Sequence, residues 1–74
     1  MPQENKIQLS IIIPVFNEEN FLNKLFNELT QYFNNKDTEV IIIDDGSTDS
    51  SNNIINKFKE DNEYKFYFKV FKLD

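Results

Sequence analysis

Two short runs of branched aliphatic residues dominate the hydrophobic pattern of the chain. Residues 7–13 (IQLSIII) and 39–44 (EVIIID) are both rich in isoleucine, and a continuous β-branched run of this length is typical of a strand buried on both faces of a parallel sheet. Pro14 has no backbone N–H, so we expect it to end the first strand. Residues 65–73 (KFYFKVFKL) alternate in part between apolar and polar positions, which predicts a third strand.

The segments between these strands have helical spacing. Residues 18–34 repeat apolar side chains three and four positions apart, so they predict a helix with one apolar stripe. Asn17 is a candidate N-cap for this helix. Residues 50–60 predict a second, shorter helix after a run of serine, threonine and aspartate that suits a helix start. The stripes consist of Phe21, Leu22, Leu25, Phe26, Leu29, Tyr32 and Phe33 in the first helix and Ile54, Ile55 and Phe58 in the second.

The order strand, helix, strand, helix, strand predicts an α/β fold with a three-stranded parallel sheet and right-handed crossovers. The residues alone leave two strand orders open, three-two-one and two-one-three. Asp45-Gly46 could form a hairpin turn, but residues 47–51 suit a helix start, so we expect no hairpin. Ligands of open parallel sheets bind beyond the carboxyl ends of the strands, which directs attention to the loops at residues 14–18 and 44–47.

Composition and charge exclude several classes of function. The chain has 74 residues, a formal net charge of −5, no cysteine and no histidine, so disulfides and the usual zinc ligands are excluded. The negative charge argues against a nucleic-acid partner. The apolar runs are too short to span a bilayer, and no secretory signal fits the first residues, so we predict a cytoplasmic location. Residues 1–6 are polar and are expected to be disordered.

Asp44 and Asp45 lie where the second buried strand should end. A carboxylate there can accept hydrogen bonds from a base N–H or a ribose hydroxyl; alternatively, one of the two caps the turn and the other is solvated. Gly46 is the only glycine in the chain and permits a positive φ. Neither GxGxxG nor a P-loop is present, which excludes the common dinucleotide and Walker phosphate sites.

Phe16 and Glu18 stand just before the first predicted helix. The Phe16 ring could stack on a nucleobase, or it could pack as a hydrophobic staple onto the first turn, for example against Phe21. Glu18 could contact a ribose or base, although a first-turn glutamate also suits the helix dipole. Residues 47–49 are better explained as helix caps than as catalytic groups, because there is no histidine to activate a serine.

Both candidate loops are acidic, and neither contains a lysine. A nucleoside diphosphate would be repelled there unless a divalent cation bridged it. We therefore expect the ligands of such a cation to lie elsewhere in the full protein, and this chain to recognise the nucleoside end only.

Two motifs in this order resemble a known family. LSIIIPVFNEENFL followed by EVIIIDDGSTDSS is similar to the opening of family 2 glycosyltransferases with the GT-A fold, and NEE and DDGSTD look most similar to the branch that makes dolichyl- or polyprenyl-phosphate sugars. The resemblance covers nearly the whole chain from about Leu9. It implies a partial Rossmann-like GT-A fold with strand order three-two-one, and transfer of a hexose from a UDP- or GDP-sugar to an acceptor, including a polyprenyl phosphate.

The resemblance also implies a donor-binding pocket made from both loops. Asp45 matches the carboxylate that contacts the base or ribose. Phe16 replaces the more usual tyrosine, so a hydrogen bond from a phenol is lost while stacking is retained. The donor-binding residues implied in this way are Pro14, Phe16, Glu18, Ile43, Asp44 and Asp45.

Family members continue into a DXD-type motif that binds Mg²⁺ or Mn²⁺, a catalytic base and an acceptor site, and none of these is found in the 74 residues. Asp44-Asp45-Gly46 is not that metal motif, because it ends the earlier strand. We therefore expect residues 1–74 to be an incomplete N-terminal nucleotide-sugar-binding part of a glycosyltransferase domain, without catalytic or metal-binding residues of its own and inactive alone.

The implied partners are a nucleotide-sugar donor, a sugar acceptor that can be lipid-linked at the cytoplasmic face of a membrane, and the C-terminal part of the same domain. A non-catalytic nucleotide-binding or interaction module is the alternative, and the coding sequence that follows residue 74 would decide between the two. A flavodoxin-like receiver domain is disfavoured, because the paired aspartates end the second strand rather than the first.

Overall fold

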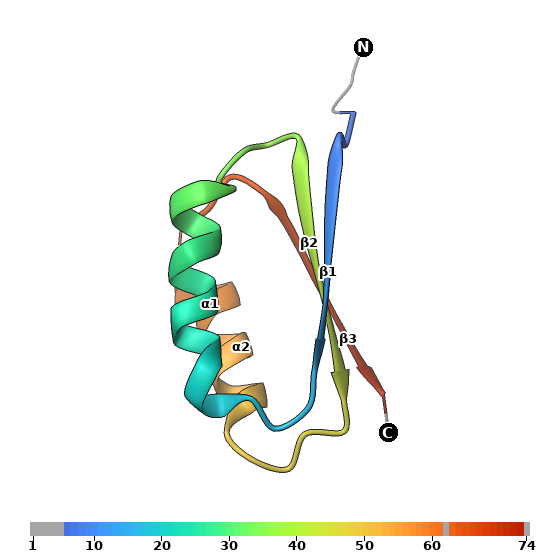
Figure 1. The fold of residues 1–74 in the computed structure, drawn as a ribbon, viewed down its shortest axis with the longest axis vertical. Helices are drawn as coiled ribbons and strands as arrows, with labels where there is room; N and C mark the ends of the chain where they lie inside the picture. Colours follow the sequence, from blue (N-terminus) through green and yellow to red (C-terminus); the bar gives the residue numbers. More distant parts are fainter. Residues whose placement is uncertain (1–5, 62, 74) are drawn as a thin grey trace.

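A computed structural model of the chain describes residues 6–61 and 63–73. The predicted α/β class and the alternation of strand and helix are confirmed, with every element end within two residues of the one expected. The expectation of disorder at residues 1–6 falls mainly on residues 1–5, which lie outside the described residues. The elements (Figure 1) are β1 (Leu9–Val15), α1 (Glu19–Tyr32), β2 (Thr38–Asp45), α2 (Ser51–Asp61) and β3 (Tyr67–Leu73).

The three strands form one parallel sheet in the order β1-β2-β3. In the central strand, Val40 pairs with Ile11 on one side and with Phe68 on the other. Both helices lie on the same face of the sheet (Figure 1), as expected when right-handed crossovers advance in one direction. The order three-two-one is confirmed, the order with strand one in the middle is wrong, and the chain enters α2 rather than a hairpin after Asp45.

Pro14 lies inside β1 instead of ending it. It stands opposite Ile43 in the parallel register, and the strand continues to Val15. β1 is an edge strand of this sheet, where a proline can turn its missing N–H away from the neighbouring strand without losing a ladder hydrogen bond. The prediction that Pro14 ends the strand is therefore wrong.

The two faces of the sheet have different surroundings. On the helix side, Val40 and Ile42 are fully buried. On the other face, Ile41 is half-buried, while Ile12 is 60% exposed and Phe71 is 53% exposed. The prediction of strands buried on both faces is thus wrong for the described residues, because α1 and α2 form a single layer and cover one face only. We call the other side the open face.

A polar group crosses one end of the open face. The Ser10 hydroxyl donates a hydrogen bond of 2.6 Å to Glu39 Oε1, and Lys69 Nζ lies 3.5 Å from Glu39 Oε2. The hydrogen bond from Ser10 lowers the pKa of the Glu39 carboxyl, burial opposes this change, and the Lys69 charge adds to it. The three strands are therefore linked by side chains as well as by the backbone.

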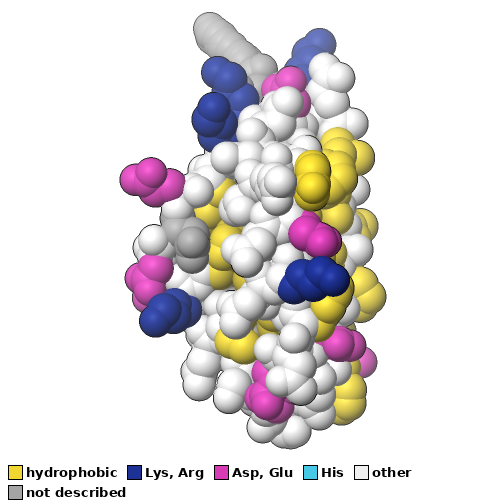
Figure 2. All heavy atoms as spheres, turned by 60° about the vertical axis from the view of Figure 1, so that its left-hand side comes forward, with side chains coloured by type: hydrophobic (Ala, Val, Ile, Leu, Met, Phe, Trp, Pro, Cys, Tyr) yellow, Lys and Arg dark blue, Asp and Glu magenta, His cyan; other side chains and the backbone are white. Residues whose placement is uncertain are grey.

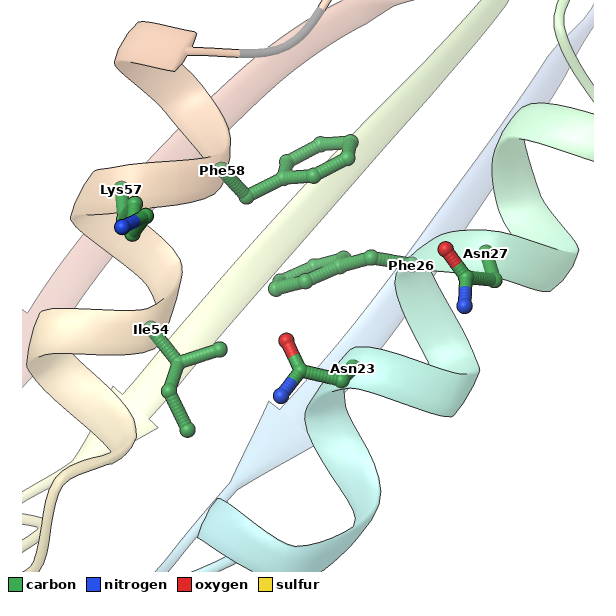
Figure 3. Close-up of a pocket in the computed structure, with 6 residues that line it drawn as sticks. All are labelled: Asn23, Phe26, Asn27, Ile54, Lys57 and Phe58. Atoms are coloured by element: carbon green, nitrogen blue, oxygen red, sulfur yellow. The ribbon is translucent and has the colours of Figure 1, made fainter.

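Aromatic rings gather in one part of the core between the helices and the sheet, beside aliphatic residues such as Leu22, Val40 and Ile42. Phe26 of α1 and Phe58 of α2 stack with ring centroids 4.2 Å apart (Figure 3), and Phe58 also stacks on Tyr64 at 5.1 Å. Pairs of this kind contribute about 0.5–1.5 kcal/mol beyond the area they bury. We call this group the aromatic cluster; it consists of Phe26, Phe58, Tyr64, Phe66 and Phe68.

The predicted apolar stripes are confirmed at their buried residues, and the first stripe fails at its ends. Leu22, Phe26 and Leu29 are buried on α1, and Ile55 and Phe58 on α2. In contrast, the end residues of the first stripe are exposed: Phe21 at 46%, Tyr32 at 68% and Phe33 at 40%.

The outer surface of the helix layer is mixed in charge. Figure 2 looks mainly onto the helix side and shows charged side chains of both signs scattered over it, with hydrophobic side chains gathered along the right-hand margin. Within residues 6–61 and 63–73, no helix has the length and apolar character needed to cross a membrane.

Candidate functional site

The two adjacent carboxylates at the end of β2 have different environments. Asp44 is 2% exposed, and its Oδ1 accepts a hydrogen bond of 3.0 Å from the backbone N–H of Ser47. Asp45 is exposed, and no described residue donates a hydrogen bond to its carboxylate. Successive side chains of a strand point to opposite faces, so Asp44 is buried on the helix side while Asp45 is exposed on the open face. Asp44 closes the turn, whereas Asp45 is free to accept a hydrogen bond from a ligand.

Gly46 turns the chain at the end of β2. Its φ of +76° lies in the left-handed region, as the sequence predicts, and this region is strained for residues with a side chain. A Cβ at this position would meet only the Leu73 carbonyl oxygen, at an ordinary 3.7 Å. The glycine is therefore required by backbone conformation and not by lack of space.

Asn17 joins the loop after β1 to the loop after β2. Its Oδ1 accepts hydrogen bonds from the backbone N–H groups of Thr48 (2.8 Å) and Asp49 (3.3 Å), and its own N–H donates to Ser47 Oγ at 3.0 Å. The N-cap position of α1 is held by Glu18, whose side chain makes no capping bond. The prediction of Asn17 as N-cap is therefore wrong, because its side chain serves the other loop.

Each helix start is capped by residues that belong to the other loop. The Glu18 N–H donates to Ser51 Oγ at 2.9 Å, and the Glu19 N–H donates to Asp49 Oδ2 at 3.2 Å. In return, Glu19 Oε1 accepts from the N–H of Ser50 at 2.7 Å, while Asp49 Oδ1 accepts from the N–H of Ser51 at 2.9 Å. These bonds supply acceptors for two backbone N–H groups at each helix N-terminus, where such groups lack intrahelical partners.

We call this set the loop network, which comprises residues 17–19 and 47–51. The interpretation of residues 47–49 as helix-capping groups is confirmed for Asp49. Sequence reasoning looked for caps within each helix and missed the exchange between the two. The available signal was the topology, since a parallel sheet brings the loops after β1 and β2 to the same edge.

Asp49 stays charged in this arrangement. Partial desolvation raises the pKa of its carboxyl, but hydrogen bonds from Ser51 and from the Glu19 backbone outweigh this effect and hold the pKa below its ordinary value of 3.8. A carboxylate accepts stronger hydrogen bonds than a neutral acid does. At neutral pH, the charged Asp49 carboxylate therefore joins the two helix starts through these hydrogen bonds.

The other predicted donor-binding residues surround the same edge. Phe16 is 56% exposed, so most of its ring surface is available for stacking. Pro14 and Glu18 line a hollow of about 110 Å³ beside β1. Ile43 is half-buried. A larger hollow of about 370 Å³ lies between α1 and α2 (Figure 3), and none of the predicted donor-binding residues lines it.

The loop edge does not fit a divalent cation by itself. In the part of the chain that the structure describes, no three His, Cys, Asp or Glu side chains gather as a metal site would require. Asp44 is bonded to the turn and Asp49 to the helix starts, and the remaining carboxylates of Asp45 and Glu18 do not gather with a third ligand among the described residues. Hard cations such as Mg²⁺ and Ca²⁺ need several oxygen ligands.

Comparison with known proteins gives a consistent result. The family model described as Glycosyl transferase family 2 matches residues 10–73. An uncharacterized glycosyltransferase of Haemophilus influenzae is 45% identical over 62 residues, which are 81% of this chain and 24% of that protein. The poly(ribitol-phosphate) beta-glucosyltransferase of Bacillus spizizenii is 40% identical over 55 residues, 73% of this chain and 9% of that protein.

A third relative is the GalNAc(5)-diNAcBac-PP-undecaprenol beta-1,3-glucosyltransferase of Campylobacter jejuni, 33% identical over 61 residues, 82% of this chain and 19% of that protein. The chain thus spans a quarter or less of the length of these relatives. No solved structure gives a significant match. The family model covers the parallel sheet, both helices and both loops of the candidate site, and the chain belongs to glycosyl transferase family 2.

Proposed function

We propose that this chain forms the nucleoside-binding part of an inverting hexosyltransferase that uses a UDP- or GDP-sugar. The observation that carries the proposal is the free carboxylate of Asp45 at the carboxyl end of the central strand. Asp44, its neighbour, is buried and bonded to the turn. A carboxylate with no hydrogen-bond donor among the described residues, held at the end of a strand, is suited to accept hydrogen bonds from a ribose or a base.

Phe16 supplies the second half of the site. Val15 and Asp44 are register partners, so the residues that follow them, Phe16 and Asp45, leave the sheet from strands about 4.8 Å apart. Stacking of a base on an aromatic ring contributes about 1–3 kcal/mol, and a hydrogen bond to a charged group about 1.5–3 kcal/mol. A ring and a carboxylate at this spacing can hold the base and the ribose of one nucleoside. Pro14, Glu18 and Ile43 border this pocket in the proposal.

The diphosphate and its cation are assigned to residues outside this chain. The loop edge is acidic, and its carboxylates do not form a cation site, so a diphosphate bound there would need Mg²⁺ or Mn²⁺ held by other residues. In the proposal, this chain orients the nucleoside, and the catalytic base and cation ligands belong to the rest of the same domain. We accordingly expect no sugar transfer by the 74 residues alone.

The acceptor in this proposal carries phosphate and is lipid-linked. The name of the Campylobacter relative contains a PP-undecaprenol acceptor and that of the Bacillus relative a poly(ribitol-phosphate), which supports an acceptor of this kind. A polyprenyl phosphate is the simplest member of the class, and a lipid-linked acceptor would place the reaction at the cytoplasmic face of a membrane.

The test uses the longest natural polypeptide that contains these residues. It is incubated with UDP- or GDP-hexoses, Mn²⁺, and one acceptor at a time: polyprenyl phosphate, undecaprenyl-diphosphate oligosaccharide or poly(ribitol phosphate). Mass spectrometry should find an acceptor heavier by one hexose, and the acceptor that reacts identifies the branch of the family. Nucleotide binding without transfer would favour a non-catalytic binding module. If the polypeptide neither binds a nucleotide nor transfers a hexose, the proposal is overturned.

A further inference from the structure

We propose that Asn17 is a positioning residue that fixes Phe16 relative to Asp45, an inference that rests on the proposed donor site. Asn17 directly follows Phe16 in the chain. Its Oδ1 accepts from the N–H groups of Thr48 and Asp49, and its N–H donates to Ser47. Asn17 therefore ties the residue after the ring to the loop that begins at Asp45.

This tie is needed because of Gly46. The glycine adopts a φ of +76° between Asp45 and the loop, and a glycine adds no side-chain contact that would hold the loop in place. The hydrogen bonds from Thr48 and Asp49 to Asn17 come two and three residues after Gly46. These bonds limit how far the turn can move, and they thereby also limit changes in the distance between the loop and Phe16.

The residue type at position 17 meets two requirements at once. Its φ of 52° lies in the left-handed region, where asparagine and aspartate are enriched among non-glycine residues. Its side chain also supplies the oxygen that accepts two N–H groups. Glycine meets the first requirement only, alanine meets neither, and aspartate meets both. Substitutions at this position can therefore separate backbone conformation from hydrogen bonding.

In the proposal, Asn17 acts by holding Phe16 and Asp45 in place. Its Oδ1 is occupied by two backbone N–H groups and its own N–H by Ser47. The effect of Asn17→Gly on nucleotide affinity should therefore depend on Asp45 being present. In an Asp45→Asn background, where the carboxylate is already lost, the same substitution should change affinity little. A residue that only stabilises the fold would show no such dependence.

The experiment measures the Kd of UDP and GDP by calorimetry, with Mn²⁺, on the longest natural polypeptide that contains the chain. Asn17→Gly should weaken binding of the nucleotide that wild type binds about tenfold, because Phe16 and Asp45 are no longer held where one nucleoside contacts both. Asn17→Asp keeps the accepting oxygen, so its affinity should stay within about threefold of wild type. Asn35→Gly is the matched control, because Asn35 Oδ1 accepts from the Asp37 N–H at 2.8 Å in a loop before β2. It should leave the Kd unchanged.

The outcomes separate the inference from the proposed function. If Asp45→Asn weakens binding but Asn17→Gly does not, the positioning role is rejected and the donor site stands. If wild type binds neither nucleotide, both are rejected. Should Asn17→Gly fail to fold, Ser47→Ala removes the acceptor of the Asn17 N–H, and it must weaken binding severalfold for the inference to hold.

Discussion

The aromatic cluster and the loop network join the same two helices to the same sheet by different forces. In the cluster, Phe26 and Phe58 stack at 4.2 Å between α1 and α2. In the network, Asp49 accepts hydrogen bonds from the N–H groups of Glu19 and Ser51, one at each helix start. Apolar burial is non-directional and tolerates many side chains of similar volume, whereas these hydrogen bonds require particular atoms in particular places.

The two regions contribute differently: the aromatic cluster stabilises the fold, and the loop network sets the geometry of the candidate site. The cluster removes large apolar surfaces from water, so it should account for more of the free energy of unfolding. Apart from the buried Ser51, the network lies among exposed or half-buried residues, where a hydrogen bond contributes only about 0.5–1.5 kcal/mol, but in the proposal it determines how Phe16 and Asp45 face a ligand. Substitutions in the aromatic cluster should therefore mainly lower the free energy of unfolding, whereas substitutions in the loop network should mainly lower nucleotide affinity.

The largest effect is expected in the aromatic cluster. Phe58→Ala should lower the free energy of unfolding by about 3–5 kcal/mol, because it removes a buried ring that stacks on Phe26 and Tyr64. Phe58→Leu, which keeps more of the volume, should cost less. Urea unfolding followed by circular dichroism measures both. A loss below about 1 kcal/mol for Phe58→Ala would show that the cluster does not carry the stability assigned to it.

A smaller effect is expected at the boundary between the two regions. Asp44→Ala should lower the free energy of unfolding by about 1–3 kcal/mol, because the Ser47 N–H loses its acceptor. Asp44→Asn keeps an oxygen that can accept this bond and should cost less. The same unfolding measurement compares the two variants. Equal stability of Asp44→Ala and wild type would contradict the turn-closing role of this carboxylate.

The smallest effect concerns pH and Asp49. Its pKa in the folded chain lies below the ordinary value of 3.8, so the stabilisation from its ionised form is present above about pH 4 and is lost as pH falls through the folded pKa. In Asp49→Asn, the unfolding midpoint should therefore fall less between about pH 5 and pH 3 than it does in wild type. An unchanged pH profile in this variant would mean that the carboxylate charge does not hold the helix starts.

Periodic apolar patterns were sufficient to predict the elements and the α/β class, while the strand order followed from the family resemblance. The two isoleucine runs, the partly alternating run at residues 65–73 and the two helical stripes predicted the five elements in the correct order, because burial depends on which face a residue occupies. The pattern failed where the neighbours of an element mattered. Pro14 was expected to end a strand that in fact continues along a sheet edge, and Ile12 was expected to be buried on a face that is open.

The candidate site was predicted less completely, for a physical reason. The residues alone left the roles of the two aspartates open, because alternation along β2 decides which carboxylate is buried, and only the family resemblance pointed to Asp45 as the ligand contact. Asn17 was expected to cap its own helix, yet it bonds to Thr48 and Asp49, more than thirty positions away. Hydrogen bonds between distant segments leave no periodic signal in the sequence, so only the assembled sheet edge reveals them.

The most direct test of the central claim is a titration of UDP and GDP, with Mn²⁺, against wild type and Asp45→Asn in the longest natural polypeptide that contains the chain, with melting followed in parallel. Asp37→Asn is the matched control, since Asp37 is also exposed but precedes β2 instead of following it. Asp45→Asn should lower the affinity for the nucleotide that binds about tenfold to a hundredfold, with little change in melting temperature. Asp37→Asn should leave the affinity unchanged. Unchanged affinity of Asp45→Asn for both nucleotides, together with a shifted melting curve, would contradict the donor site and leave Asp45 a role in the turn alone.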